Sequence, residues 1–534
     1  MTKKDQQLIE RIADGARKGQ ISRRDFMHYS LAAGLTVSGA TGLWSTAAKA
    51  APKRGGTFRW GLHDGNTSDT HDPGTYLTRQ MIFLAHTHRS FLTMIMGDGS
   101  LGPDLADSWS ASDDASEWTF EITQNASFHN GKAVTADDVI ASMNHHRGDA
   151  SQSAAKSLLA DVTDIRKDGE NTVVITLSRG NADLPWLMTD YHLCICPAND
   201  DGSIDWQSGT GSGPYKIDSG NFGVSWSLSR HDGWHREGAY FDKVEILVLN
   251  DPNARQTALV TGDVDAVSLI ELKTMALLQR DPNIVIHNIP SAGAITMPMH
   301  CDTAPFDNVD VRTALKLAMN RDEIIEKITF GASTKGNDFH HSPAQPYWPD
   351  GLEQRAYDPD QAKSLLAKAG AEGLSISLSV AESVYAGAVD MAVLYAEQAK
   401  AAGINIKVVR EPNDGYYSEV WLKKPFCLVS WGARPTPDVM YTLAYKDDAA
   451  WNESRWQNER FNELLLQAKA ELDEALRAEM YREMATLARD DGGTLIPFFN
   501  NFVYANRANV GTPENLAASW ENDGARAASR WWFT

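Results

Sequence analysis

The chain has 534 residues, and its 70 Asp and Glu against 50 Lys and Arg give a formal net charge of −20. Such an acidic chain is a poor partner for nucleic acid or for an anionic lipid surface, so we expect neither as a partner. With 42% hydrophobic and 22% charged residues, it has the composition of an ordinary globular protein of several domains. No run of about 18 apolar residues occurs, so the sequence predicts no transmembrane helix.

Residues 1–50 have the pattern of a targeting segment. Ser22-Arg23-Arg24-Asp25-Phe26-Met27 resembles the twin-arginine export motif, and a mildly apolar stretch from Leu31 to Ala48 follows it. Ala48-Lys49-Ala50 is an A-x-A cleavage site, so we expect the twin-arginine machinery to export the protein and cleavage to occur before Ala51. The alternative is an amphipathic helix that stays attached. No Cys stands at the cleavage point, so we expect a soluble periplasmic monomer without a lipid anchor.

The stretch from Glu117 to Val139 has a clear local pattern. Thr119 to Ile122 alternates polar and apolar residues, as a half-buried strand does. Asn130-Gly131 is a turn dipeptide. Thr135 can cap a helix whose first turn holds Asp137 and Asp138, where the helix dipole favours anions. The stretch therefore predicts a strand, a turn and a capped helix.

Later segments also predict helices. Within Asp310–Gly331, the apolar residues repeat at helical spacing and form one face. Asp358 as N-cap, Pro359 at the first position and Gly370 beyond the end define another helix. Phe461 to Arg489 predicts two consecutive helices. In contrast, the glycines of Gly209–Lys216 predict a loop that approaches other backbone closely.

These segments together resemble one family. The run Glu117–Val139, with Trp118, Phe120, Phe128-His129 and Thr135-Ala136, resembles the signature of the family-5 solute-binding proteins of ABC importers, the peptide, opine and nickel receptors of bacterial periplasms. Further blocks match in family order and extend the resemblance from about Gly55 to Val510: Leu101–Trp109, Gly209–Lys216, Asp310–Gly331, Tyr357–Ala362 and Gly493–Phe499.

The resemblance implies an α/β fold, the class II-like two-lobe periplasmic binding protein fold, with an extra inserted α/β domain. Two crossover strands would join the lobes, and ligand would bind between them as they close by hinge motion. Lobe I would comprise residues 51–88, 208–294 and 506–534. The inserted domain would comprise residues 89–207, and lobe II residues 295–505.

The implied function is capture of a solute and its delivery to an ABC permease in the inner membrane. No H-E-x-x-H, G-x-S-x-G or P-loop motif is present, so we expect no enzyme and no cofactor. An exported hydrolase remains a remote alternative.

Arg434 is the residue where the chain departs from the peptide-binding pattern. Peptide-binding members carry "W-x-A-D-Y-x-[DE]-P", whose first Asp receives the ligand's ammonium group; the matching segment here begins Trp431-Gly432-Ala433-Arg434 and ends Pro437-Asp438. An Arg cannot accept a hydrogen bond, and its planar fork suits a carboxylate, phosphate or sulfonate. The resemblance therefore implies a small anionic or zwitterionic solute, peptide-like or opine-like. The alternative is that Arg434 pairs with Asp438, or with another carboxylate of lobe II, as part of the structure.

Aromatic and polar residues are further candidates for the ligand site. An aromatic-lined cleft suits a small organic ligand. The candidates in lobe II are Tyr416, Tyr417, Trp421 and Trp431, although each could instead be core. In lobe I, Asp69 and Thr70 lie in the polar loop Asp64–Tyr76, where family members supply the opposite wall of the cleft.

Histidines and cysteines leave two alternatives open. His86 with His88 and the pairs His145-His146 and His340-His341 allow a metal or nickel-chelate receptor of the same fold, although single pairs are usually surface residues, and we predict no metal site. Cys194 and Cys196 flank Ile195 on a predicted strand, and they could not easily bridge each other there. A Cys301–Cys427 disulfide is conceivable after export. The alternative is that the four cysteines are buried free thiols.

Overall fold

The computed structural model describes Phe26, Tyr29, Ser30 and residues 52–534. Apart from those three residues, the predicted export signal over residues 1–50 lies outside the described part. Within that part, none of the helices combines the length and the apolar character needed to cross a bilayer.

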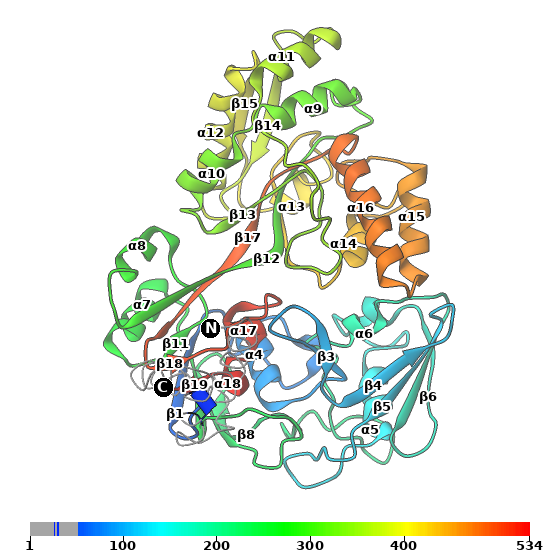
Figure 1. Ribbon diagram of the computed structural model, residues 1–534, viewed down its shortest axis with the longest axis vertical. Helices are drawn as coiled ribbons and strands as arrows, with labels where there is room; N and C mark the ends of the chain where they lie inside the picture. The colour runs from blue at the N-terminus through cyan, green and yellow to red at the C-terminus, as the bar shows by residue number, and fades with distance from the viewer. Residues whose placement is uncertain (1–25, 27–28, 31–51) are drawn as a thin grey trace.

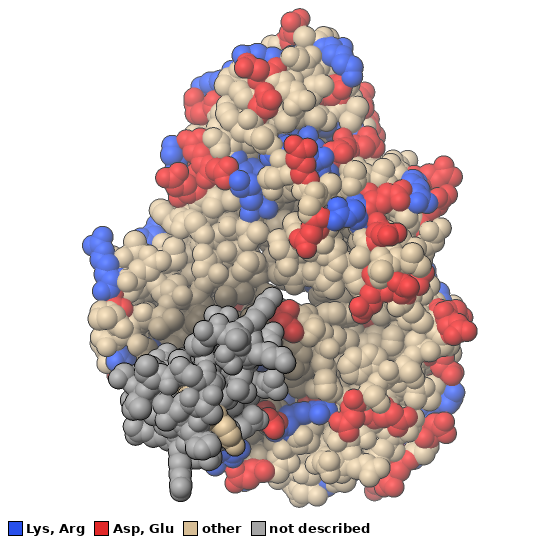
Figure 2. Space-filling model, viewed as in Figure 1, with Lys and Arg blue, Asp and Glu red and all other residues tan. Residues whose placement is uncertain are grey.

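The described chain forms three units that meet at the centre of the molecule (Figure 1). We call them lobe I at the lower left, the insert at the lower right and lobe II at the top. Each has its own buried hydrophobic cluster. The mixed α/β architecture confirms the predicted fold class, while the residue boundaries given above stay a prediction. On the face shown in Figure 2, acidic and basic side chains are interspersed, and a hollow lies where the upper and lower parts meet.

Lobe I is built on a mixed sheet in which β1 runs parallel to both β10 and β11. Phe58 and Trp60 of β1 are buried because alternate residues of this strand face the core. The elements of lobe I are β1 (Thr57–Leu62), η1 (Pro73–Thr75), α4 (Arg79–His88), β8 (Tyr215–Asn221), β9 (Ser225–Arg230), β10 (Lys243–Val248), α7 (Pro252–Thr261), β11 (Ala266–Val267), η3 (Leu272–Thr274), α8 (Met275–Leu278), β18 (Val510–Gly511), α17 (Glu521–Ala525), α18 (Ala527–Arg530) and β19 (Trp532–Phe533).

The insert is a four-stranded sheet in the order β4-β5-β7-β6, with neighbouring strands antiparallel. Trp118 and Phe120 of β5 contribute to its core. Its elements are β2 (Thr93–Ile95), β3 (Leu101–Pro103), β4 (Ala106–Ala111), β5 (Glu117–Ile122), α5 (Ala136–His145), η2 (Lys156–Leu159), β6 (Val162–Lys167), β7 (Thr172–Leu177) and α6 (Leu184–Leu187).

Two long antiparallel strands, β12 (Ile284–Pro298) and β17 (Thr494–Arg507), run from lobe I into lobe II (Figure 1). They form the centre of a nine-stranded sheet in the order β16-β12-β17-β11-β1-β10-β9-β8, with β13 paired to β17. Their register shifts between Pro290 and Ala294. Such an irregularity bends a strand pair, and this one lies at the passage between the lobes.

Lobe II is mainly helical around the parallel pair β14 and β15. Val311, Ala314, Leu315 and Ala318, the predicted apolar face, are buried in its core. Its elements are α9 (Val309–Leu317), α10 (Arg321–Ile328), β13 (Ser333–Lys335), α11 (Pro359–Lys368), β14 (Ser375–Val380), α12 (Ala388–Lys400), β15 (Asn405–Arg410), α13 (Tyr416–Glu419), β16 (Val429–Trp431), α14 (Pro437–Ala444), α15 (Glu459–Ala470) and α16 (Glu474–Asp490).

Most of the local predictions are confirmed. Thr135 is the N-cap of α5, and the Asp138 carboxylate accepts the Thr135 N–H at 2.9 Å. Asp358 caps α11 by accepting the Gln361 N–H at 2.8 Å. The two helices predicted within Phe461–Arg489 are α15 and α16.

The glycine loop at Gly209–Lys216 makes the predicted close approach. A Cβ on Gly211 would lie 1.8 Å from the His88 carbonyl oxygen, and one on Gly213 would lie 2.6 Å from the Arg89 nitrogen. These glycines let the loop pack on the end of α4, where lobe I continues into the insert.

The prediction of a strand at Cys194 and Cys196 is wrong, because both lie in irregular backbone. Their sulfurs accept hydrogen bonds from the buried Arg89 guanidinium, which shapes this segment more than sheet pairing does. All four cysteines are free thiols, so the Cys301–Cys427 disulfide does not form in this structure.

Candidate functional site

A cavity of about 520 Å³ lies where the insert, lobe II and the C-terminal part of lobe I meet. That volume is in the range of small-molecule sites. All three units contribute, as a site between closing lobes requires. From the insert, the wall includes Leu158, Asp161, Asp183, Trp186, Asp190 and Tyr191. Lobe II contributes Arg434, Asp438, Val439, Trp451 and Lys469, and lobe I contributes His86, Ser519, Trp520 and Arg526.

Aromatic side chains form part of the wall. The Tyr191 and Trp520 rings meet edge to face, with centroids 5.6 Å apart. The Arg79 guanidinium lies over the Trp520 ring, 4.7 Å from its centroid, and holds that ring in place. Trp186 and Trp451 come from the insert and from lobe II. Rigid aromatic surface of this kind favours an organic solute.

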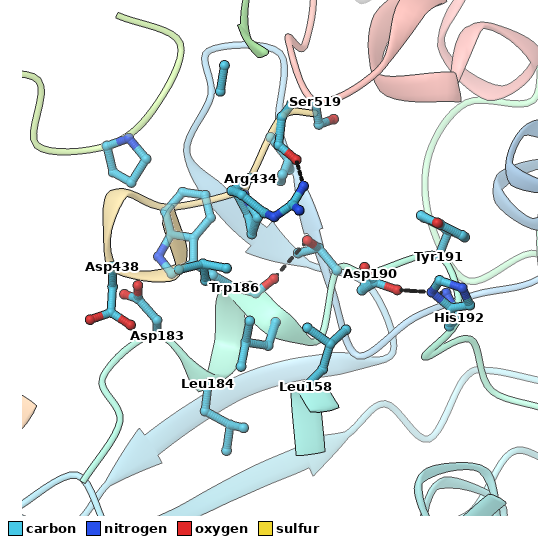
Figure 3. A pocket seen from close by; sticks show the side chains of 18 of the residues that line it. Leu158, Asp183, Leu184, Trp186, Asp190, Tyr191, His192, Arg434, Asp438 and Ser519 are labelled. Carbon is cyan, nitrogen blue, oxygen red and sulfur yellow. Dashed lines mark hydrogen bonds and ion pairs between the residues drawn. The ribbon is translucent and has the colours of Figure 1, made fainter. Parts of the chain in front are cut away.

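Arg434 lies in the short connection between β16 and α14 and lines the cavity (Figure 3). Its Nη1 donates to two carbonyl oxygens of its own loop, those of Gly432 at 3.2 Å and Ala433 at 3.1 Å. The Gln345 amide donates to the Arg434 carbonyl at 3.0 Å and fixes the loop. The guanidinium is therefore positioned mainly through backbone contacts.

No carboxylate of the described residues lies within ion-pair distance of the Arg434 guanidinium. The alternative of an Arg434–Asp438 pair therefore does not occur. Burial lowers the pKa of Arg434 from 12.5, and the nearby Asp190 and Tyr191 oppose that shift. An arginine starting from such a high pKa keeps its charge at neutral pH.

Two buried carboxyl groups lie at another place on the wall (Figure 3). Asp183 immediately precedes α6 of the insert, and Asp438 lies in the first turn of α14. Asp183 accepts a hydrogen bond from Arg477 at 2.6 Å through Oδ1. Asp438 Oδ1 and Asp183 Oδ2 have no hydrogen-bond partner among the described residues. Burial raises the pKa of Asp438 to about 7, and the neighbouring Asp183 adds to the shift.

Trp431 and Trp421 do not line the cavity but lie behind its wall. Both indoles donate to Oε2 of the buried Glu453, at 3.0 Å from Trp431 and 2.9 Å from Trp421. Their rings also pack on Trp451, with centroids 6.0 and 5.8 Å away. Burial raises the pKa of Glu453 to about 7. Glu453 thus fixes an aromatic cluster that supports the cavity through Trp451.

The remaining predicted residues lie away from this cavity. Tyr416 is 2% exposed, and its hydroxyl donates to the Ser379 and Leu428 carbonyls, as a core residue does. Tyr417 is 43% exposed. The Asp69 carboxylate accepts from Thr78 Oγ1 at 2.7 Å, and Thr70 Oγ1 contacts Thr75 Oγ1 at 2.9 Å. These contacts are internal to lobe I.

The histidines singled out in the sequence make dispersed contacts. Only His86 lines the cavity, and burial lowers its pKa well below 6.5, which keeps the ring neutral. His145 contacts Asp72 at 2.7 Å, and His341 contacts the Pro346 carbonyl at 2.8 Å. Across the described residues, His, Cys, Asp and Glu do not gather in groups of three that could hold a metal ion.

Sequence reasoning did not identify Asp183, Trp186, Tyr191 or Trp520 as site residues. They belong to the predicted inserted domain and to the C-terminal part of lobe I, in which the sequence analysis named no candidate residue for the solute site. Asp438 was considered only as the end of the motif segment and as a possible partner of Arg434. The cavity collects these residues because the insert reaches across to α14, an arrangement with no local signal.

The family model for bacterial extracellular solute-binding proteins, family 5, middle region, matches residues 100–453. A probable peptide ABC transporter periplasmic-binding protein of Sinorhizobium fredii is 27% identical over 422 residues, covering 73% of this chain and 74% of that protein. The nickel-binding periplasmic protein of Escherichia coli is 26% identical over 310 residues, covering 56% of this chain and 58% of that protein.

Solved structures share the fold. HbpA2 from Haemophilus parasuis superimposes with a TM-score of 0.78 at 19% identity, over 87% of this chain and 99% of that one. At this identity the likeness concerns the fold alone. Because the family model covers well over half of the residues, this chain belongs to family 5 of the bacterial extracellular solute-binding proteins, the periplasmic receptors of ABC importers.

Proposed function

We propose that this receptor captures a small anionic or zwitterionic solute, peptide-like or opine-like, and holds an anionic group of that solute on Arg434. One observation carries the proposal: a partly buried guanidinium without a carboxylate partner among the described residues lines a cavity of about 520 Å³. A bidentate contact with a carboxylate would satisfy this fork. The relatives include peptide and nickel receptors, so the proposed preference for an anion rests on Arg434 and not on similarity to these relatives.

The solute would be released unchanged to an ABC permease, without a chemical step and without a cofactor. Export by the twin-arginine route, as a monomer without a lipid anchor, belongs to the same proposal and rests on the pattern of residues 1–50. Cell fractionation of the full-length precursor checks the location, and a membrane-bound mature form would contradict it.

A thermal-shift screen tests the ligand class, because a solute that binds only the folded form raises its apparent stability. The probes are N-(1-carboxyethyl)-L-alanine as an opine-type acid, L-Ala-L-Glu, L-Ala-L-Ala and nickel chloride. We expect the opine-type or acidic probe to stabilise the protein. In Arg434→Gln the affinity for that probe should fall by at least about tenfold, the value of a lost charge-assisted hydrogen bond.

Arg460→Gln is the matched control, because Arg460 pairs with Glu483 on the surface, away from the cavity. It should bind like the unmodified protein. Stabilisation by L-Ala-L-Ala that survives Arg434→Gln would overturn the anion assignment. Stabilisation by nickel chloride alone would instead favour the metal-receptor alternative.

A further inference from the structure

We propose that the cavity holds a second charged subsite, in which the carboxyl groups of Asp183 and Asp438 receive a cationic amine of the solute. The inference rests on the proposed function and narrows it. The solute would be a zwitterion whose anionic group lies on Arg434 and whose amine lies between the two carboxyl groups.

The first observation is that each carboxyl group keeps a buried oxygen without a donor. Asp183 is 1% exposed and Asp438 is 4% exposed. Arg477 donates to Oδ1 of Asp183, so Oδ2 of Asp183 has no hydrogen-bond partner in the described chain. Oδ1 of Asp438 also has no partner there. Both residues line the cavity, and Figure 3 shows their carboxyl groups side by side. A buried acceptor without a donor is costly, and an N–H group of the solute would remove that cost.

The second observation is the charge around the pair. Asp161 and Lys469 also act on Asp438, together with Asp183 and Arg477, and the Tyr481 ring lies beside Arg477. Arg179 and Lys469 pair with Asp161, and Arg477 pairs with Asp183, so Asp438 is the one of these three carboxyl groups without an ion-pair partner among the described residues. A proton or one monovalent cation would neutralise an ionised Asp438. The raised pKa of Asp438 agrees with uptake of a proton by this carboxyl group.

These surroundings favour an organic amine over a metal ion. A divalent ion would be repelled by Lys469 and Arg477, and it would find no third His, Cys, Asp or Glu close enough within the described chain. An ammonium group has one charge and several N–H donors, which matches two separate acceptor oxygens.

The third observation is that the two carboxyl groups belong to different units. Asp183 lies in the insert, and Asp438 lies in lobe II. Two ionised carboxylates would repel each other across this boundary and oppose the Asp183–Arg477 pair that holds the units together. A cation between them contacts both units at once, so it binds the closed arrangement better than an open one and favours closure. Arg434 lies at a separate place on the same cavity wall, so the proposal requires a zwitterion that spans the two places (Figure 3).

The test compares matched probes on the full mature protein. N-(1-carboxyethyl)-L-alanine and L-Ala-L-Glu each carry an amine, and their N-acetyl derivatives keep every carboxylate but lose that charge. We expect the amine-bearing probe that binds to lose at least about tenfold in affinity on N-acetylation. Asp438→Asn should weaken the amine-bearing probe by a similar factor and leave its N-acetyl derivative unchanged.

Asp448→Asn is the matched control, since the Asp448 side chain is 74% exposed and lies in the same lobe. It should bind both forms of the probe like the unmodified protein. The melting temperature of each variant without probe establishes that it is folded. If Asp438→Asn does not fold, the comparison of amine with N-acetyl probes in the unmodified protein decides by itself.

A pH series adds a readout that a purely structural role would not move. Because Asp438 must lose its proton to receive an amine, affinity for the amine-bearing probe should fall as the pH drops below about 7. The N-acetyl probe should lack this dependence, and so should Asp438→Asn with either probe. Glu453 titrates in the same range, but Asp438→Asn leaves it intact and so separates the two.

The outcomes distinguish the two proposals. If a probe binds in an Arg434-dependent way but its N-acetyl form binds equally well, the amine subsite is overturned and the anion site stands. The same follows if Asp438→Asn leaves the amine preference intact. If no anionic or zwitterionic probe stabilises the protein, the proposed function fails, and the amine subsite fails with it.

Discussion

Asp183 and Arg477 form a buried ion pair between the insert and lobe II. The Arg477 Nη2 to Asp183 Oδ1 distance is 2.6 Å, and the side chains are 3% and 1% exposed although they lie 294 residues apart in the chain. Arg477 also donates to the Ala468 carbonyl at 3.0 Å and lies 4.8 Å from the Tyr347 ring centroid. This pair closes one side of the cavity and leaves the second oxygen of Asp183 for a ligand.

Arg477→Met should strongly destabilise the contact between the insert and lobe II. Removing one partner of a buried pair leaves an uncompensated charge and typically costs about 3–5 kcal/mol. We expect a lower midpoint of thermal unfolding by calorimetry and earlier proteolysis of the insert. Arg460→Met removes an exposed pair with Glu483 and should have little effect. Equal effects of the two variants would mean that the Asp183–Arg477 pair does not hold the units together.

Glu453 should make stability depend on pH through the aromatic cluster. Burial raises its folded-state pKa from 4.5 to about 7, so folding takes up a proton at this group. Its contribution to stability is full below about pH 4.5 and is lost as the pH rises through about 7. Glu453→Gln keeps one acceptor oxygen for the Trp421 and Trp431 indoles, which both donate to a single oxygen, but has no charge to bury.

The measurable quantity is the difference in free energy of unfolding between Glu453→Gln and the unmodified protein. It should shift in favour of the variant by about 2–3 kcal/mol between about pH 5 and pH 8. Urea unfolding at several pH values gives the free energy of unfolding of each protein. Subtracting the two values removes the contribution of the buried histidines, whose lowered pKa values make stability rise with pH. Glu419→Gln on the surface is the control. A difference that does not change with pH would contradict the raised pKa.

The four cysteines should titrate as free thiols. Cys194 and Cys196 are fully buried beside Arg89, so a thiol reagent should reach them slowly in the native protein. After unfolding without a reductant, a colorimetric thiol assay on periplasmic protein should find all four. Two reactive thiols in place of four would show that a disulfide forms after export, with Cys301 and Cys427 as the first pair to map.

Local structure followed the sequence closely where short-range rules act. The cap at Thr135, the helix that begins at Pro359 and the glycine approach at Gly211 depend on nearby residues or on the absence of a side chain. The strand expected at Cys194 failed because a strand needs a partner strand, which the sequence around it cannot supply. At that position the Arg89 guanidinium instead donates to the Cys194 and Cys196 sulfurs.

The site was predicted only in part. Arg434 could be identified because it stands where the peptide-binding motif has an Asp. The structure places Arg434 in the cavity wall. Trp431 belongs to the same motif and Trp421 was a candidate only as an aromatic residue, yet both indoles point to Glu453, behind the wall. Aromatic residues serve cores and ligand sites equally well, so residue type alone could not separate the two roles.

The sequence by itself determined the family, the order of helices and strands, and the positive charge at Arg434 where the peptide-binding motif has an Asp. Each of these depends on residues close together in the chain. Only the tertiary structure decided which side chains meet at the cavity. Asp183, Asp438 and Arg477 come from separate segments, and none carries a local signal. Their burial together decides which oxygens stay unpaired and which carboxyl group has a raised pKa, since both depend on solvent removed by residues distant in the chain.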